Sequence, residues 1–136
     1  MTNNEIVVYT DGGSRGNPGP AGIGVVIKDE NGNILKEYSE YIGTATNNQA
    51  EYRAVLKAFD LIEEYCPCEV DFYLDSELVA KQLSREYKIK NPELAKLFVK
   101  IWNKQMQRAK AVFHSIPRDQ NKHADRLVNQ AIDRQE

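Results

Sequence analysis

Four acidic residues stand where a carboxylate has no ordinary structural reason to be: Asp11, Glu51, Asp75 and Asp125. Asp11 and Asp75 follow apolar, strand-like runs, and Glu51 lies within the apolar stripe of a predicted helix. Asp125 borders the stripe of another predicted helix. Carboxylates a few ångströms apart raise one another's pKa values, so a converging set needs cations to stay ionised. The four acids therefore predict a site for one or two divalent metal ions.

Each acid also has an ordinary alternative role. Asp11 could form a turn through its side chain, and Asp75 could cap the helix that follows it. Glu51 could offset the dipole near a helix start, and Asp125 could be a boundary residue. The combination favours a site, because strand ends at one edge of an open α/β sheet are where such proteins bind ligands.

Two polar segments accompany the acids. Residues 12–19 are rich in glycine, but they connect two predicted strands and lack the Gly-Lys-Ser/Thr ending of a phosphate-binding P-loop. Their glycines permit close approach of sugar and phosphate groups. The amides Asn47, Asn48 and Gln49 exceed what a helix cap needs, although Thr46 or Asn47 could cap. They could bond to sugar hydroxyls or base edges in a shallow minor groove.

Composition predicts one globular domain over residues 1–136, with 41% hydrophobic and 28% charged residues. No apolar run reaches the roughly 18 residues of a membrane span, and the first residues lack the pattern of a signal peptide, so we expect a cytoplasmic protein without a membrane partner. Residues 78–110 carry nine basic and two acidic residues. This bias indicates either a solvated helix face or a surface that attracts a polyanion.

The hydrophobic periods predict an α/β fold with a mixed sheet flanked by helices. An Asn31-Gly32 turn between two strands predicts a hairpin, so the first three strands are antiparallel. Asn91-Pro92 should interrupt the middle helical region. The predicted strands are residues 6–9, 21–28, 34–41, 70–74 and 111–116. The predicted helices are residues 47–65, 77–84, 93–108 and 121–134.

The motifs of the chain are, in order, Tyr9-Thr10-Asp11-Gly12-Gly13-Ser14, Gly16-Asn17-Pro18-Gly19, Thr46-Asn47-Asn48-Gln49-Ala50-Glu51, Asp75-Ser76, and Ala124-Asp125 with Leu127. Together they resemble the ordered motifs of type 1 ribonuclease H, and the resemblance covers essentially the whole chain. The resemblance implies a ribonuclease H-like fold with a five-stranded mixed sheet. It also implies an endonuclease that cuts the RNA strand of RNA/DNA hybrids.

Carried over by position, the resemblance implies that Asp11, Glu51, Asp75 and Asp125 hold two Mg²⁺ ions, with Mn²⁺ as a substitute. One ion would lower the pKa of the attacking water and the other would stabilise the leaving 3′ oxygen, giving 5′-phosphate and 3′-hydroxyl ends. Asp11 would bridge the two ions.

The resemblance also implies substrate contacts. The candidates for RNA minor-groove and 2′-hydroxyl contacts are Gly13, Ser14, Asn47, Asn48 and Gln49. The candidates for backbone phosphates are Asn17, Thr44 and Thr46.

The chain departs from the family pattern at three places. Many relatives place a catalytic histidine in the loop before the final helix, but residues 117–121 contain none; Arg118 could steady a phosphate there, and His123 is an alternative substitute. His114 lies within a predicted strand and is expected in the core. A tryptophan-rich basic protrusion is not recognisable, so hybrid binding would depend on Lys81, Lys88 and Lys90. Glu77 follows Asp75-Ser76 where an amide would contact a base better.

Two other function classes stay open at this point. One is a catalytically silent ribonuclease H-like module that binds nucleic acid, which the presence of all four acids disfavours. The other is a small-molecule phosphohydrolase or nucleotide-binding domain, which lacks a P-loop and a nucleophile motif. We expect a monomer, and the sequence leaves open whether double-stranded RNA is also cut.

Overall fold

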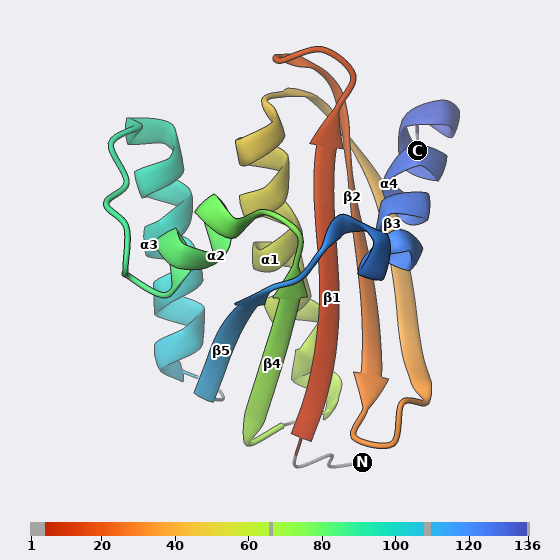
Figure 1. Ribbon diagram of the computed structural model, residues 1–136, viewed down its shortest axis with the longest axis vertical. Helices are drawn as coiled ribbons and strands as arrows, with labels where there is room; N and C mark the ends of the chain where they lie inside the picture. Colours follow the sequence, from red (N-terminus) through yellow and green to blue (C-terminus); the bar gives the residue numbers. More distant parts are fainter. Residues whose placement is uncertain (1–4, 66, 108–109, 136) are drawn as a thin grey trace.

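Five strands form one mixed sheet in the order β3-β2-β1-β4-β5 (Figure 1). The computed structural model describes residues 5–65, 67–107 and 110–135. The strands are β1 (Glu5–Ser14), β2 (Gly19–Asp29), β3 (Ile34–Ala45), β4 (Glu69–Leu74) and β5 (Lys110–Ser115). β2 is antiparallel to both β1 and β3, whereas β4 is parallel to both β1 and β5. The predicted fold class is therefore confirmed. Arg108, which ends a predicted helix, and the first four residues lie outside the described ranges.

Helices cover both faces of the sheet. They are α1 (Asn47–Leu61), α2 (Glu77–Leu83), α3 (Pro92–Gln107) and α4 (Lys122–Arg134), with 3-10 turns at Ile62–Tyr65 and Arg118–Gln120. In Figure 1, α1 and α3 lie behind the sheet and α4 lies on the opposite face, against β2 and β3. β4 and β5 have no helix on the α4 side in this view.

Local side-chain hydrogen bonds define where several elements begin. Thr46 and Gln49 form a capping box at the start of α1, and Ser76 caps α2 by accepting from the backbone N–H of Val79. The Asn91 side chain accepts from two backbone N–H groups at the start of α3, which confirms the predicted break at Asn91-Pro92. Asp29 accepts two backbone N–H groups across the predicted Asn31-Gly32 turn.

The core lies mainly between the sheet and the helices α1 and α3, because the apolar stripes of those helices face the sheet. Its buried side chains include Val8, Val25, Tyr52, Phe59, Phe72, Leu94 and Ile101. A smaller cluster of Val26, Ala124 and Leu127 lies under α4. β1 is thus packed between α1 on one face of the sheet and α4 on the other.

The first strand is longer than its apolar run predicts. β1 continues through Asp11 to Ser14, with Asp11 opposite Gly24 of β2. Its pairing with β4 stops at Tyr9 opposite Tyr73. The prediction that the strand ends before Asp11 was wrong, because the glycines after Asp11 pair with β2 and do not turn away from it.

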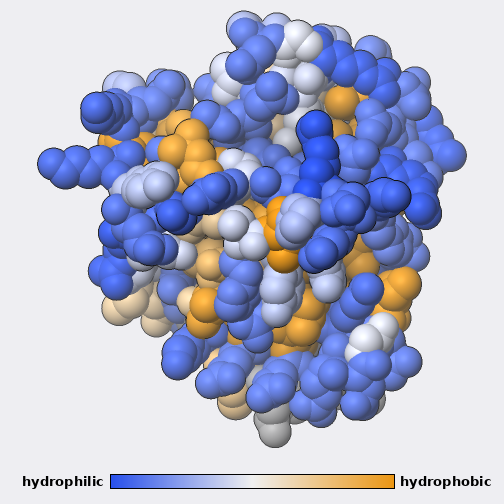
Figure 2. Space-filling view, viewed as in Figure 1, coloured by the Kyte–Doolittle hydropathy of each residue, from blue (hydrophilic) through white to orange (hydrophobic). Residues whose placement is uncertain are grey.

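His114 was also wrongly predicted to lie in the core. Its side chain is 39% exposed on the uncovered face of β5, where it stacks on Tyr73 and lies 2.8 Å from Asp71. Figure 2 shows that this face of the molecule is mostly hydrophilic, with apolar residues scattered among the polar ones. None of the helices within the described ranges is long and apolar enough to cross a membrane.

Candidate functional site

Three of the predicted acids converge. Asp11 comes from β1, Glu51 from the first half of α1, and Asp75 from the residue after β4. Each contributes a carboxylate oxygen to a cluster in which these atoms lie within 4.8 Å of one another. Asp11 and Glu51 are each only 6% exposed, and Asp75 is half-buried. β1, α1 and the end of β4 therefore bring three carboxyl groups into one small volume.

Two glycines allow helices from opposite faces to reach Asp11. A Cβ atom added to Gly12 would lie 2.2 Å from the backbone carbonyl of Ala50, so α1 can pack there only against glycine. On the other face, a Cβ atom added to Gly24 would lie 2.3 Å from the backbone oxygen of Ala124. These close approaches place Glu51 and Asp125, the residues after Ala50 and Ala124, beside β1.

The cluster opposes ionisation of its own members. Burial, followed by the charge of Asp75, raises the pKa of Asp11 from 3.8 to about 8. Burial also raises the pKa of Glu51 well above its ordinary value, with further contributions from Asp11 and Asp75. Asp11 and Glu51 share a side-chain hydrogen bond. Without a cation, the fold therefore favours a protonated carboxyl group at this site.

The donor set fits a hard divalent cation. Oε2 of Glu51 is buried and has no hydrogen-bond partner in the part of the chain that the structure describes. A buried carboxylate oxygen without a partner is costly unless it binds a proton or a metal. Carboxylate oxygens are also the ligands that Mg²⁺ and Mn²⁺ prefer. Asp11, Glu51 and Asp75 could thus hold a metal.

Asp125 lies near this cluster without belonging to its closest set. It sits in the first turn of α4 and is half-buried. Its charge and a side-chain hydrogen bond both raise the pKa of Asp11, so the two carboxyl groups face each other. The structure therefore brings the other three predicted acids close to Asp11 on β1, and Asp125 lies outside the closest set.

Sequence reasoning missed Asn121, which looked like an ordinary first residue of the last helix. Asn121 is 1% exposed. Its Nδ2 donates to Oδ2 of Asp75 at 3.1 Å and to the backbone oxygen of Thr10 at 2.9 Å. An asparagine at a helix start is so common that its sequence position gives no signal of a tertiary role.

The amide and glycine segments meet beside the acids. The backbone N–H and the hydroxyl of Ser14 both donate to Oδ1 of Asn47, at 2.9 and 3.1 Å. Oδ1 of Asn17 accepts from the backbone N–H of Asn47 at 3.0 Å. Gly13 lies beside Asn47, since a Cβ atom added there would be 3.9 Å from Oδ1. The loop after β1 and the start of α1 therefore form one hydrogen-bonded rim.

Two further predicted contact residues, Thr46 and Gln49, are paired with each other. Oγ1 of Thr46 accepts from the backbone N–H of Gln49, and Oε1 of Gln49 accepts from the backbone N–H of Thr46. Thr44 is exposed at the end of β3, and Asn48 is half-buried in the first turn of α1. Thr44 and Asn48 thus remain more available to a ligand than the capping pair.

The two candidates for the missing loop histidine lie in different settings. Arg118 is exposed in the 3-10 turn before α4. Nε2 of His123 lies 2.7 Å from Oε2 of Glu37 on β3, so its ring is engaged away from the acids. This geometry favours Arg118 over His123 as a group that could reach a substrate.

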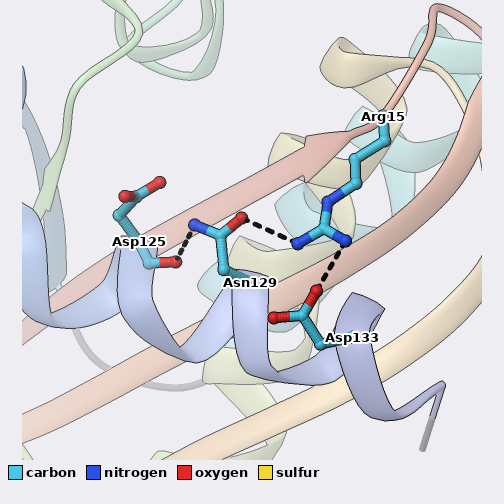
Figure 3. A network of polar contacts seen from close by, with 4 residues as sticks. All are labelled: Arg15, Asp125, Asn129 and Asp133. Carbon is cyan, nitrogen blue, oxygen red and sulfur yellow. Dashed lines mark hydrogen bonds and ion pairs between the residues drawn. The ribbon is translucent and has the colours of Figure 1, made fainter.

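A polar network joins the β1–β2 loop to α4 (Figure 3). The Arg15 guanidinium lies 2.6 Å from Oδ1 of Asp133 and donates to Oδ1 of Asn129 at 3.3 Å. Nδ2 of Asn129 donates to the backbone oxygen of Asp125 at 3.0 Å. Figure 3 shows the Asp125 carboxylate pointing away from Arg15, so this network holds α4 without engaging that carboxylate.

A groove of about 580 Å³ adjoins the amide rim. Its lining includes Asn48, Leu78, Tyr87, Lys88 and Lys90. It therefore combines cations with apolar surface beside a predicted contact residue. Lys81, by contrast, lies 3.1 Å from Glu77.

The chain is similar to a family model, to solved structures and to a longer curated protein. A family model described as reverse transcriptase-like matches residues 9–131. LC11-RNase H1, a protein isolated from compost by a metagenomic approach, is 51% identical in sequence to this chain. Its structure was solved in complex with an RNA/DNA hybrid. It matches with a TM-score of 0.91 over 96% of this chain and 98% of that one. RNase H1 from the halophilic archaeon Halobacterium salinarum is 36% identical, with a TM-score of 0.92 over 96% of this chain and 98% of that one.

A longer relative matches over part of its own length. The bifunctional protein Rv2228c of Mycobacterium tuberculosis is 41% identical over 130 residues, which is 95% of this chain and 36% of that protein. The chain thus spans about a third of the length of this curated relative.

Proposed function

The chain belongs to the type 1 ribonuclease H family, and on that premise we propose that it is a metal-dependent endonuclease that hydrolyses the RNA strand of RNA/DNA hybrids. The observation that carries the proposal is the convergence of the carboxylates of Asp11, Glu51 and Asp75, with an unpartnered oxygen on Glu51. The hybrid bound to LC11-RNase H1 supports the choice of substrate.

The proposed metal ligands are Asp11, Glu51 and Asp75, with Asp125 completing the site from α4. Two Mg²⁺ ions are the proposed cofactor, with Mn²⁺ as a substitute. Divalent ions bound there would lower the pKa of the attacking water and stabilise the leaving 3′ oxygen. The products would then carry 5′-phosphate and 3′-hydroxyl ends.

The neighbouring residues would bind and orient the substrate. Backbone at Gly13 and the side chains of Ser14, Asn47 and Asn48 lie along one rim, where they could contact 2′-hydroxyl groups and so distinguish RNA from DNA. Arg118 is exposed before α4 and could steady a phosphate. Its guanidinium would act by donating hydrogen bonds to the phosphate oxygens.

The adjoining groove would hold a nucleic-acid backbone. Lys88 and Lys90 supply positive charge there, while Leu78 and Tyr87 are 44% and 46% exposed and offer apolar surface for sugars. Phosphate contacts of this kind strengthen binding without reading sequence. The groove therefore supports a polymeric substrate over a mononucleotide.

Cleavage of an end-labelled RNA/DNA hybrid with Mg²⁺ tests the proposal. Single-stranded RNA, double-stranded RNA and double-stranded DNA of the same sequence serve as comparison substrates. We expect hybrid-selective cutting by the native chain and a loss of about 10³-fold or more in Asp75→Asn, because that change removes a metal ligand. Asp60→Asn on the exposed face of α1 is the matched control and should cut at the native rate.

Three outcomes would redirect the proposal. A folded chain that binds hybrids but cuts none with Mg²⁺ or Mn²⁺ would identify a catalytically silent binding module. Hydrolysis of mononucleotides in preference to polymers would identify a phosphohydrolase. Equal cutting of double-stranded RNA would broaden the substrate class.

A further inference from the structure

Asn121 occupies a capping position without capping. It immediately precedes α4, where an asparagine side chain ordinarily accepts a backbone N–H of the first turn. Here its side chain makes no such bond. Nδ2 instead donates to Oδ2 of Asp75 and to the backbone oxygen of Thr10. The side chain is thus committed to β1 and to the end of β4.

This arrangement costs the fold stability. The first turn of α4 forgoes a side-chain cap. In addition, Oδ1 of Asn121 is buried and has no hydrogen-bond partner within the described ranges. Violations of local rules without a compensating local gain are expected where function requires them.

The backbone of Asn121 adds two further links. Its N–H donates to the Arg118 oxygen at 3.0 Å, and its carbonyl accepts the Asp125 N–H at 3.1 Å. One residue is therefore bonded to Asp75, to the strand residue before Asp11, to the helix start that carries Asp125 and to the turn that carries Arg118. Asn121 lies outside the sequence motifs that predict the site.

We propose that Asn121 is a positioning residue that fixes the Asp75 carboxylate for cation binding, an inference that rests on the proposed function. A donor on Oδ2 holds the carboxylate plane in one orientation, and the remaining lone pairs stay available to a metal. An amide suits this task because it donates without a positive charge, which would compete with the cation. The hydrogen bond to Thr10 also ties Asp75 to the strand of Asp11, so one side chain links the carboxylate of Asp75 to β1 just beyond the last β1–β4 pair.

The first experiment compares Asn121→Ala and the equal-sized Asn121→Asp with the native chain. We expect the Mg²⁺ concentration for half-maximal hybrid cleavage to rise about 10- to 100-fold, as for other partners of metal ligands, while the KM for hybrid at saturating Mg²⁺ stays near native. The exposed α3 residue Asn103, changed to alanine, is the control and should keep the native Mg²⁺ dependence.

A readout independent of activity is the rise in melting temperature that Mn²⁺ produces. We expect this rise to be reduced in both Asn121 variants and in Asp75→Asn. If Asn121 acts through Asp75, adding Asn121→Ala to Asp75→Asn should reduce the rise no further. Reductions that add in the double variant would overturn the proposal.

These experiments distinguish failure of the proposed nuclease function from failure of the positioning role of Asn121. If the native chain cuts no hybrid but the Mn²⁺ effect still depends on Asn121, the proposed function fails and the positioning role stands. If it cuts hybrids and both Asn121 variants keep native metal dependence, the positioning role alone is lost. Should the variants not fold, the Asn121 carboxamide signals in a ¹⁵N spectrum of the otherwise native chain decide. They should shift with Mg²⁺ and lose that shift in Asp75→Asn, and an unchanged signal would overturn the proposal.

Discussion

Asp11 and Glu51 are two buried carboxyl groups that repel each other when both are ionised. Burial and neighbouring acids raise both pKa values, so each group prefers its protonated form in the metal-free fold. A bound cation would reverse that preference, because it favours the ionised ligand. Cation binding at this site would therefore release protons.

The pH dependence of stability follows from Asp11. Its pKa of about 8 in the fold lies above its ordinary value of 3.8, so its stabilising contribution is complete below about pH 4 and is lost as the pH rises to about 8. In EDTA, we expect the melting temperature to fall between about pH 5 and about pH 8.5 and to recover with Mg²⁺. Asp11→Asn should melt higher than the native chain at pH 8, by about 5 °C or more, with a smaller gain at pH 5.

Thermal unfolding in EDTA at several pH values measures this effect. The control Asp60→Asn changes an exposed carboxylate in α1 and should keep the native pH profile. A metal-free melting temperature that rises from pH 5 to pH 8.5 would contradict the assigned direction.

At the residue scale, the sequence predicts the acids better than it predicts the residues around them. Asp11, Glu51 and Asp75 are recognisable because a carboxylate in or after an apolar run conflicts with local preference. Asn121 was missed, and His114 was wrongly predicted in the core, because each fits its local pattern, a helix start and a strand interior. Their roles depend on which strands lie beside them, which no local pattern reports.

At the scale of elements, the site depends on how closely α4 approaches β2. Gly24 lies under the first turns of α4, where an added Cβ atom would be 2.3 Å from the Ala124 oxygen and 2.9 Å from Cβ of Leu127. The backbone oxygen cannot move without the helix. Any side chain at Gly24 should therefore displace the helix that carries Asp125.

Gly24→Ala should damage both stability and activity. We expect a loss of about 1–3 kcal/mol from overpacking and a fall in kcat/KM of about 10-fold or more from displacement of Asp125. Denaturant unfolding and hybrid cleavage measure the two effects.

Gly32→Ala is the control that separates the effect on stability from the effect on activity. Gly32 has a φ of +86° in an open hairpin turn, with no atom within 4 Å of an added Cβ, so the change strains the backbone far from the site. It should lower stability and keep kcat/KM. If Gly24→Ala also kept its kcat/KM, close packing of α4 would not be what positions Asp125.

The extent of β1 illustrates what periodicity leaves out. The apolar run predicts a strand over residues 6–9, yet pairing continues to Ser14 because β2 runs alongside through Gly24, Ile23 and Gly22. The hairpin at Asn31-Gly32 was predictable because its turn chemistry is local. How far two strands stay paired is a property of both strands together.

At the scale of the whole molecule, the basic residues of the segment 78–110 differ in whether an acidic side chain pairs with them. Within residues 78–110, Lys81, Lys96 and Lys104 are paired with acids, whereas Lys88 and Lys90 line the groove beside Asn48. Lys88 and Lys90 are therefore positions at which the charge of this segment can be tested beside a predicted contact residue.

Removing charge from this groove should weaken hybrid binding in a salt-dependent way. For the double variant Lys88→Ala and Lys90→Ala, we expect the slope of log K against log salt to decrease in magnitude by about 1–2, because up to two phosphate contacts are lost. Binding of a labelled hybrid in Ca²⁺ at several salt concentrations measures the slope. Lys36→Ala on β3, which pairs with Glu64, should keep the native slope.

The four acids come from β1, α1, the end of β4 and α4, so neither side of a break between β4 and α4 contains a complete site. A chain divided in the exposed turn at Arg118–Gln120 would give two fragments, one with three of the acids and one with Asp125. Recovery of cleavage on mixing would then report that the fragments had found each other. The distribution of the four acids along the chain thus makes this fold suited to a split-protein sensor of association.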